Sequence, residues 1–345
     1  MTVLMAYLHG RQNWQINQIP GEQLTHLNYA FAKIDGKNLV DKGAHIKRIA
    51  TIKRRFPNLK VNISIGGWGA EGFSDAVLNA DSRNKFATNI INFIQQYGLD
   101  GVDFDWEYPG SALGGIKSRT QDAENFYAFL KVLREKLASC SDEYEISAAI
   151  AGDPSLLTSL ISGEKLSIAE YLDYLNVMTY DLRGSWTNIT GHQTNLYPYE
   201  AMEGELSIDT TVKYLIANQV PANKIVIGSA AYSRNWLEVD KEARSPVGAL
   251  AKEKGIQTTP YQKIDQLIAQ KPKNYFWDAQ ASAPYYFDKQ VFMSFDDKKS
   301  MKNKAMYAKE HHLGGLMLWE LSLDPQNQLI LAAANALRGD GREIK

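Results

Sequence analysis

The stretch DGVDFDWE, which runs from Asp100 to Glu107, decides how this sequence folds. Apolar and acidic residues alternate within it, Val102, Phe104 and Trp106 against Asp103, Asp105 and Glu107. Such alternation is typical of a β-strand with two unlike faces, because successive side chains of a strand point in opposite directions. Carboxylates packed at this density repel one another and are more stable in water. Their place on a strand therefore indicates a functional site.

This stretch lies in the fourth of eight short segments that are rich in Val, Ile and Tyr. The eight segments cover residues 3–8, 26–32, 60–67, 101–108, 145–151, 174–181, 224–232 and 314–321. Helical patterns lie between them at 44–56, 121–139, 207–219 and 300–312, and another helix is expected to begin at a cap, Asp81 or Ser82, and to stop at Gly98. Strands alternating with helices form parallel βαβ units, and eight repeats predict an α/β fold of the (β/α)8 TIM barrel type.

The regular spacing breaks between the seventh and eighth strands. Residues 236–290 contain Pro246, Pro260, Pro272 and Pro284 and many aromatic residues, which can support a modest core. We therefore expect a small inserted subdomain at 236–290. The whole chain, 1–345, is interpreted as one catalytic barrel that carries this insertion.

Composition excludes several classes of function. With 38 Lys and Arg against 39 Asp and Glu, the net charge of -1 provides no field that would attract nucleic acid or an anionic membrane. No apolar run approaches the ~20 residues that span a bilayer. The single cysteine, Cys140, excludes an internal disulfide and a multi-cysteine metal site. The first residues, MTVLMAYLHG, show no secretory leader. We expect a monomer with no nucleic-acid or membrane partner.

Active sites of (β/α)8 barrels lie at the carboxyl ends of the strands. In this sequence those ends carry aromatic and charged residues, namely Tyr7, Phe31, Trp68, Glu107, Tyr180, Asp181, Tyr232, Arg234, Trp319 and Glu320. Sugar faces stack on aromatic rings, and sugar hydroxyls bind charged and polar groups, so this ring of residues favours a sugar site. For any single aromatic residue, packing at the barrel mouth is the alternative role.

The alternation places Asp103, Asp105 and Glu107 in the barrel lumen, with Glu107 nearest the mouth. Asp100 does not fit the alternation, so we expect it at the lower end of the strand, in a structural hydrogen-bonding role. Carboxyl groups stacked in a medium of low dielectric constant cannot all ionise, so at least one pKa is raised. A raised pKa suits a general acid. We therefore assign Glu107 as proton donor to a leaving oxygen, Asp105 as its partner and Asp103 as the deeper residue that takes or returns a proton.

The sequence offers two other interpretations of these acids. One is a buried carboxylate network held by arginine or backbone donors, and the segment itself contains no basic residue. The other is a divalent-cation site, but carboxylates on a straight strand diverge too far for one ion to bind all three. We therefore expect neither a metal nor another cofactor.

The residues alone do not decide which group acts as the nucleophile. Asp105 shares the strand and the side of Glu107, so it is poorly placed as the nucleophile of an ordinary retaining glycosidase. Asp181 or Glu320, from other strands, could serve instead. The third possibility is that the substrate provides its own nucleophile.

The motifs DGVDFDWEYP, SIGGW (64–68), MTYD (178–181) and GGLMLWE (314–320), in this order, resemble glycoside hydrolase family 18, the chitinases and their relatives. The resemblance implies hydrolysis of β-1,4 bonds after N-acetylglucosamine, in chitin or its oligomers, with retention and through an oxazolinium formed by the substrate. It implies action outside the cell.

The same resemblance implies roles for individual residues. Glu107 matches the acid, Asp105 the residue that orients the acetamido group, and Asp103 the residue that shares a proton with Asp105. Tyr180 matches the tyrosine that hydrogen-bonds the acetamido oxygen, and Trp319 the floor under the reacting sugar. Further positions that line the family's cleft are Tyr7, Phe31, Trp68, Met178, Asp181, Tyr232 and Arg234, with Trp186 as a platform on the aglycon side.

The insertion resembles the α+β insertion of the family branch that has deep clefts. This chain departs from that branch in Tyr232-Ser233-Arg234, where a glycine is common between the two, and in the loop AGDPS (151–155), so exo and endo action both stay open. Two other functions are kept as alternatives. One is a non-catalytic chitin-binding lectin, which usually lacks the acid that Glu107 supplies, and the other is an endo-β-N-acetylglucosaminidase acting on N-glycan cores.

Overall fold

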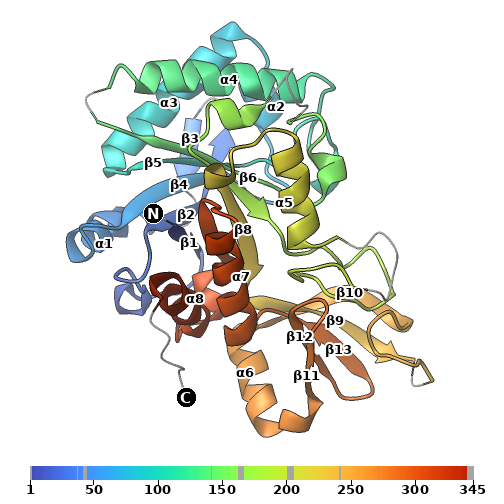
Figure 1. Cartoon of the computed structure of the whole chain (residues 1–345). Coiled ribbons are helices and arrows are strands. Elements are labelled where there is room, and N and C mark those ends of the chain that lie inside the picture. The colour runs from blue at the N-terminus through green and yellow to red at the C-terminus, as the bar shows by residue number, and fades with distance from the viewer. Residues whose placement is uncertain are drawn as a thin grey trace.

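A computed structural model describes residues 2–36, 38–41, 45–140, 142–161, 167–199, 206–240 and 242–339. Eight parallel strands form a closed barrel (Figure 1): β1 (Val3–His9), β2 (His26–Asp35), β4 (Lys60–Gly66), β5 (Gly101–Asp105), β6 (Glu145–Ala151), β7 (Tyr174–Met178), β8 (Ile225–Ala230) and β14 (Gly315–Trp319). They follow chain order around the barrel, which β1 closes by pairing with both β2 and β14. The predicted (β/α)8 fold is confirmed.

Helices surround this barrel. They are α1 (Ile49–Arg55), α2 (Phe73–Ala76), α3 (Ala80–Tyr97), α4 (Asp122–Leu137), α5 (Ile208–Ala217), α7 (Lys298–Glu310) and α8 (Gln328–Arg338). Short 3₁₀ helices lie in the connections, namely η1 (Ile16–Gln18), η2 (Ile46–Arg48), η3 (Leu113–Gly115), η4 (Pro154–Leu156), η5 (Ile168–Glu170), η6 (Ala222–Lys224), η7 (Pro272–Asn274) and η8 (Leu321–Leu323). A short strand, β3 (Asn38–Asp41), pairs antiparallel with the end of β2. Each helix predicted from the sequence has a counterpart, although residue 44 lies outside the described residues.

The start of α3 corrects one prediction. Its N-cap is Asn79, not Asp81 or Ser82. The Asn79 side chain accepts a hydrogen bond from the Ser82 backbone N–H at 3.0 Å, and the Ser82 hydroxyl oxygen accepts one from the Asn79 N–H at 3.0 Å. Ser82 is therefore the reciprocal partner of the cap, three residues into the helix. The helix ends as predicted at Gly98, which has a φ of +62°.

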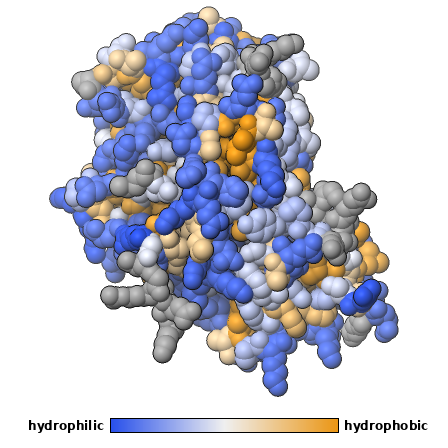
Figure 2. Space-filling model, viewed as in Figure 1, coloured by the Kyte–Doolittle hydropathy of each residue, from blue (hydrophilic) through white to orange (hydrophobic). Residues whose placement is uncertain are grey.

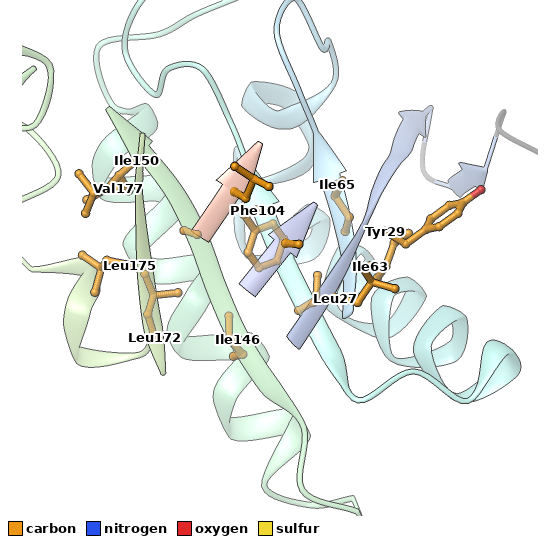
Figure 3. Close-up of a cluster of buried hydrophobic side chains, with 14 of the residues drawn as sticks. Leu27, Tyr29, Ile63, Ile65, Phe104, Ile146, Ile150, Leu172, Leu175 and Val177 are labelled. Atoms are coloured by element: carbon orange, nitrogen blue, oxygen red, sulfur yellow. The ribbon is translucent and has the colours of Figure 1, made fainter. Parts of the chain in front are cut away.

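The outward face of β5 belongs to the main hydrophobic core. Val102 and Phe104 are fully buried, and the Phe104 ring lies edge-on to Phe126 and Phe129 of α4 at 5.7 and 5.5 Å. Figure 3 shows Phe104 among side chains from neighbouring strands, including Ile63 and Ile146. The apolar half of DGVDFDWE thus packs between barrel and helices, as the alternation predicts, which leaves its acids facing the lumen.

At the other end of the same strand, Asp100 has the predicted structural role. One carboxylate oxygen accepts a hydrogen bond from the Val61 backbone N–H at 2.7 Å, and the other lies 2.7 Å from the Lys53 ammonium. Asp100 therefore ties the start of β5 to β4 and α1.

The insertion before β14 is a five-stranded antiparallel sheet with one helix, and it forms the lower lobe in Figure 1. Its elements are β9 (Tyr232–Val239), β10 (Ala251–Pro260), α6 (Tyr261–Gln270), β11 (Tyr275–Asp278), β12 (Ala283–Phe287) and β13 (Val291–Ser294). Trp236 and Phe292, both fully buried, lie in a separate small core. The sheet extends beyond the predicted bounds 236–290 at both ends, since β9 begins at Tyr232 and β13 ends at Ser294. At the first of these ends, only Ala231 separates β8 from β9.

Most of the surface visible in Figure 2 is hydrophilic, and the apolar residues form separate patches. Among the described residues, no helix has both the length and the apolar character that crossing a membrane requires.

Candidate active site

A cleft of about 960 Å³ opens where the carboxyl ends of the barrel strands meet the insertion. The predicted site residues that line it are Phe31, Trp68, Asp105, Glu107, Met178, Tyr180, Asp181, Trp186, Tyr232, Arg234 and Trp319. Asp103 and Tyr7 do not line the cleft, since both are buried inside the barrel. The fold thus brings together side chains from distant parts of the sequence.

Asp103 is held by side-chain donors from four other strands. One of its oxygens accepts hydrogen bonds from the hydroxyls of Tyr7 (3.0 Å) and Ser64 (2.6 Å). The other accepts from the Ser147 hydroxyl (2.6 Å) and the Asn176 amide (3.0 Å). Burial raises the pKa of Asp103, and these hydrogen bonds act in the opposite direction. Asp103 is therefore an acid that can exchange a proton in the lumen while its position stays fixed.

Tyr7 lies under the cleft floor, where its side chain is 1% exposed. Its hydroxyl donates to Asp103, and its ring lies 5.6 Å from that of Trp319. Burial, together with the charges of Asp103 and Asp105, raises the pKa of Tyr7, so the phenol stays a hydrogen-bond donor. This position gives Tyr7 a role toward the acids, and its direct contact with a sugar stays a prediction.

Asp105 is the last residue of β5 and is 5% exposed. Its Oδ1 atom is buried and has no hydrogen-bond partner among the described residues. Burial raises the pKa of Asp105, and the charges of Glu107 and Asp103 add to this effect, whereas the charge of Lys33 lowers it. The unpartnered oxygen is thus available to a ligand in the cleft.

Glu107 lies two residues beyond the end of β5, whereas the sequence predicted a strand through residue 108. The strand ends earlier because β4 ends at Gly66, directly opposite Asp105. Burial raises the pKa of Glu107 to about 7, with a further contribution from Asp181, while a hydrogen bond from Tyr108 and the charge of Lys33 oppose it. Glu107 can therefore hold a proton near neutral pH, as a general acid requires.

The glycines of SIGGW allow this arrangement. A Cβ atom at Gly66, which has a φ of +121°, would lie 2.0 Å from the carbonyl oxygen of Asp105. A Cβ atom at Gly67 would lie 2.7 Å from the Phe31 ring, and the Gly67 N–H donates to the Asp105 carbonyl at 2.9 Å. Only glycine lets the backbone approach the acidic strand and the aromatic wall this closely.

Asp181 and Arg234, which both line the cleft, form a bidentate ion pair. The Arg234 Nε and Nη2 atoms each donate to one Asp181 oxygen at 2.6 Å. Tyr180 and Tyr232 lie beside this pair with their rings edge to face at 6.5 Å. Tyr232 and Arg234 are on β9, the first strand of the insertion, and not at the end of a barrel strand as predicted. The apolar pattern continues from β8 into β9, so the sequence does not mark the change of sheet.

Glu320 is, with Asp181, one of the two carboxylates that the sequence offers as a protein nucleophile. It is 3% exposed and is absent from the cleft lining. One of its oxygens accepts from the Ser322 hydroxyl and the other from the Ser322 backbone N–H at 3.1 Å, which caps η8. Glu320 and Asp181 are both engaged with protein donors, so Asp105 and Glu107 are the better candidates for direct action on a ligand.

The cleft exposes large apolar side chains. Trp319 stacks on Phe31 with ring centroids 5.5 Å apart at an angle of 23°. Trp68 and Trp186 are 62% and 58% exposed. Exposed apolar surface gathered in one cleft is typical of a site that a ligand covers.

Sequence reasoning missed several residues of this site. Leu113 and Ile256 line the cleft and are 46% and 63% exposed, but neither belongs to a motif. Lys33 and Tyr108 act on the acids through charge and a hydrogen bond. A signal did exist for Asn176, since it is a polar residue in the middle of the apolar strand YLNVM. The described residues contain no group of three or more His, Cys, Asp or Glu side chains that could hold a metal ion.

The sequence is similar to those of known proteins over most of its length. Two similar proteins are Chitotriosidase-1 of Mus musculus, 32% identical over 320 residues (87% of this chain and 67% of that protein), and Chitinase A1 of Niallia circulans, 32% identical over 315 residues (86% and 44%). This chain thus spans less than half the length of Chitinase A1.

Solved structures are similar over nearly the whole chain. A glycoside hydrolase family 18 N-acetylglucosaminidase from Paenibacillus barengoltzii superposes with a TM-score of 0.89 at 32% identity, covering 98% of this chain and all of that one. Chitinase ChiW from Paenibacillus sp. str. FPU-7 superposes with a TM-score of 0.90 at 36% identity, covering 98% of this chain and 33% of that one. The family description "Glycosyl hydrolases family 18" matches residues 3–324. The chain belongs to glycosyl hydrolases family 18.

Proposed function

We propose that this protein is a chitinase, which hydrolyses the β-1,4 bonds of N-acetylglucosamine polymers and oligomers with retention, and that the acetamido group of the substrate is the nucleophile. The observation that carries the proposal is the pair formed by Asp105 and Glu107 in one cleft. Asp105 has one oxygen to which no residue in the described part of the chain donates a hydrogen bond, and the pKa of Glu107 is about 7. One acid is thus available to orient the substrate, and the other can donate a proton.

The first step transfers a proton from Glu107 to the glycosidic oxygen while the bond from that oxygen to the anomeric carbon breaks. The acetamido oxygen forms a new bond to the anomeric carbon from the other face, which produces an oxazolinium ring. The oxygen of Asp105 accepts a hydrogen bond from the acetamido N–H and stabilises the positive charge. Tyr180 donates its hydroxyl to the acetamido oxygen, and burial, which raises its pKa, keeps that hydroxyl protonated.

In the second step Glu107, now ionised, takes a proton from a water molecule. The water oxygen bonds to the anomeric carbon, and the bond to the acetamido oxygen breaks, so the β configuration is restored. Asp103, held by four donors, can share a proton with Asp105 during the cycle. Trp319, stacked on Phe31, provides a flat apolar surface for the reacting sugar.

The engagement of the other carboxylates supports a nucleophile from the substrate. Asp181 is bound through both oxygens to Arg234, and Glu320 caps η8 away from the cleft wall. A retaining mechanism with a protein nucleophile needs a carboxylate about 5 Å from the acid and across the sugar plane. Trp68 and Trp186 provide exposed surfaces for further sugars on the aglycon side.

A second candidate is an N-acetylglucosaminidase, which is favoured by the similarity to the Paenibacillus barengoltzii N-acetylglucosaminidase. The same acids would act, and only the released product would differ. We propose that the protein acts as a monomer. Because chitin is an extracellular polymer, we propose that the protein acts outside the cell.

Product analysis with N-acetylglucosamine oligomers of two to six units tests the proposal. Chromatography, and proton NMR of the anomeric signals in the first minutes, compare the wild type with Glu107→Gln. The control variant is Glu124→Gln, because Glu124 is exposed. We expect β-anomeric products from the wild type and the control, and binding without cleavage by Glu107→Gln. Release of N-acetylglucosamine alone would identify exo action. Binding without cleavage by all three proteins would contradict the proposal and favour a lectin.

A further inference from the structure

Lys33 is a cation at the active site to which no motif of the sequence points. It lies on β2 and is half-buried. Its ammonium donates a hydrogen bond to the carbonyl oxygen of Gly66 and lies 5.2 Å from the centre of the Phe31 ring. The side chain therefore extends from β2 across the carboxyl end of β4, toward the strand that carries the acids.

The sheet register places the residue whose carbonyl binds this ammonium, Gly66, opposite Asp105. Gly66 is paired with Asp105 between β4 and β5, and the following residue, Gly67, donates its N–H to the Asp105 carbonyl at 2.9 Å. A hydrogen bond to the Gly66 carbonyl thus fixes the charge of Lys33 one strand away from Asp105. A lysine elsewhere on the rim could sample many rotamers, whereas this one is restrained by both the carbonyl and the ring.

We propose that Lys33 is a positioning residue of the active site, whose fixed positive charge favours the ionised forms of Asp105 and Glu107. This charge opposes burial, which raises the pKa of both acids. An ionised Asp105 is needed to stabilise the oxazolinium, and Glu107 must ionise after it has donated its proton. Lys33 acts through these acids and is absent from the cleft lining. The kinetic part of this inference rests on the proposed hydrolase function.

Other charged and titratable groups also surround the two acids. They are Asp103 on β5, Asp181 after β7 with its partner Arg234, and the tyrosines Tyr7, Tyr108, Tyr180 and Tyr232. Lys33 also acts on His9: burial lowers the pKa of this imidazole, the charges of Arg11 and Lys33 add to the effect, and the charge of Glu320 opposes it. Asp103 and Asp181 disfavour a further negative charge, whereas Lys33 lowers the pKa of both Asp105 and Glu107. Removing Lys33 therefore removes part of what compensates the repulsion between the acids.

The test compares Lys33→Met, which removes the charge and keeps much of the volume, with Lys33→Arg, which keeps the charge. Lys53→Met is the matched control, because Lys53 pairs with Asp100, which lies at the start of β5, the end of that strand opposite to Asp105. The pH profile of kcat/KM is measured on a soluble fluorogenic chitobioside. We expect both limbs of the Lys33→Met profile to move to higher pH by roughly half a unit, since a partly exposed cation is screened. Lys33→Arg and Lys53→Met should keep the wild-type limbs.

A titration that does not need turnover separates this inference from the proposed function. Carboxyl carbons labelled with ¹³C are followed by NMR from pH 4 to 9, and the Glu107 signal is assigned by its loss in Glu107→Gln. A higher Glu107 pKa in Lys33→Met than in the wild type, restored by Lys33→Arg, supports the inference even if the wild type cleaves no substrate. An unchanged Glu107 titration in Lys33→Met, or a Lys33→Arg variant that behaves like Lys33→Met, would overturn it.

Discussion

Replacing Glu107 by glutamine should abolish activity. The same substitution should stabilise the folded protein at neutral and alkaline pH, but not at acidic pH. The pKa of Glu107 is about 7 in the folded protein, against an ordinary value of 4.5. Between these two values the folded protein binds more protons than the unfolded chain, so the free energy of unfolding falls as the pH rises. The penalty is absent below pH 4.5 and complete above pH 7.

The size of the effect follows from the same two values. Their difference corresponds to about 3 kcal/mol of unfavourable burial of the ionised form. Glutamine keeps the volume of the protonated acid and carries no charge. We therefore expect Glu107→Gln to unfold like the wild type at pH 4.5 and to be more stable by as much as ~3 kcal/mol at pH 8.

Urea denaturation at pH 4.5, 6, 7 and 8 measures this difference, with equal m-values as a check that both proteins unfold in the same way. A difference in stability that does not change with pH, or a loss of stability at pH 8, would refute the reasoning. Glu145→Gln provides a control of opposite sign. Burial opposes the charge of Glu145, but His26 at 2.9 Å and Lys60 outweigh burial and lower its pKa to about 2.

Further predictions concern the other parts of the site. Glu145→Gln should destabilise the protein at pH 7 by at most ~3 kcal/mol, and urea denaturation should show this loss disappearing as the pH falls from 4.5 toward 2. Phe104→Ala should lower the free energy of unfolding by about 3–5 kcal/mol, because it empties a fully buried aromatic cluster, and leave the pH limbs of activity unchanged. Trp186→Ala should raise KM for oligomers of five units more than for two, with kcat altered less, in a comparison of initial rates.

Much of this fold follows from patterns that are local in sequence. Alternation alone predicts that Phe104 faces the helices and Asp103 the lumen, because a strand offers only two faces. The N-cap of α3 shows where local rules fail. Asn79, Asp81 and Ser82 are all good capping residues, and the sequence does not say which one the incoming chain presents to the free N–H groups.

The rest of the site depends on pairings that are distant in sequence. Asp181 and Arg234 are 53 residues apart and meet only because β9 leaves the barrel after Ala231. Lys33 reaches Gly66 only because β2 and β4 are neighbours in the barrel. The family resemblance predicted eleven of the cleft-lining residues, since its motifs encode such pairings indirectly, but it carries no signal for residues such as Ile256 and Lys33.

The two faces of β5 divide stability and chemistry between them. Phe104 on the outer face packs against Phe126 and Phe129, so a change there alters the free energy of unfolding and leaves the charges in the lumen as they are. On the inner face the pKa values of Asp103, Asp105 and Glu107 are all raised, so each ionised acid destabilises the folded protein. The raised pKa that the proposed role of Glu107 as a proton donor requires is the same quantity that lowers stability at neutral pH. An active enzyme of this design therefore has to retain enough apolar burial on the outer face to offset the acids on the inner one.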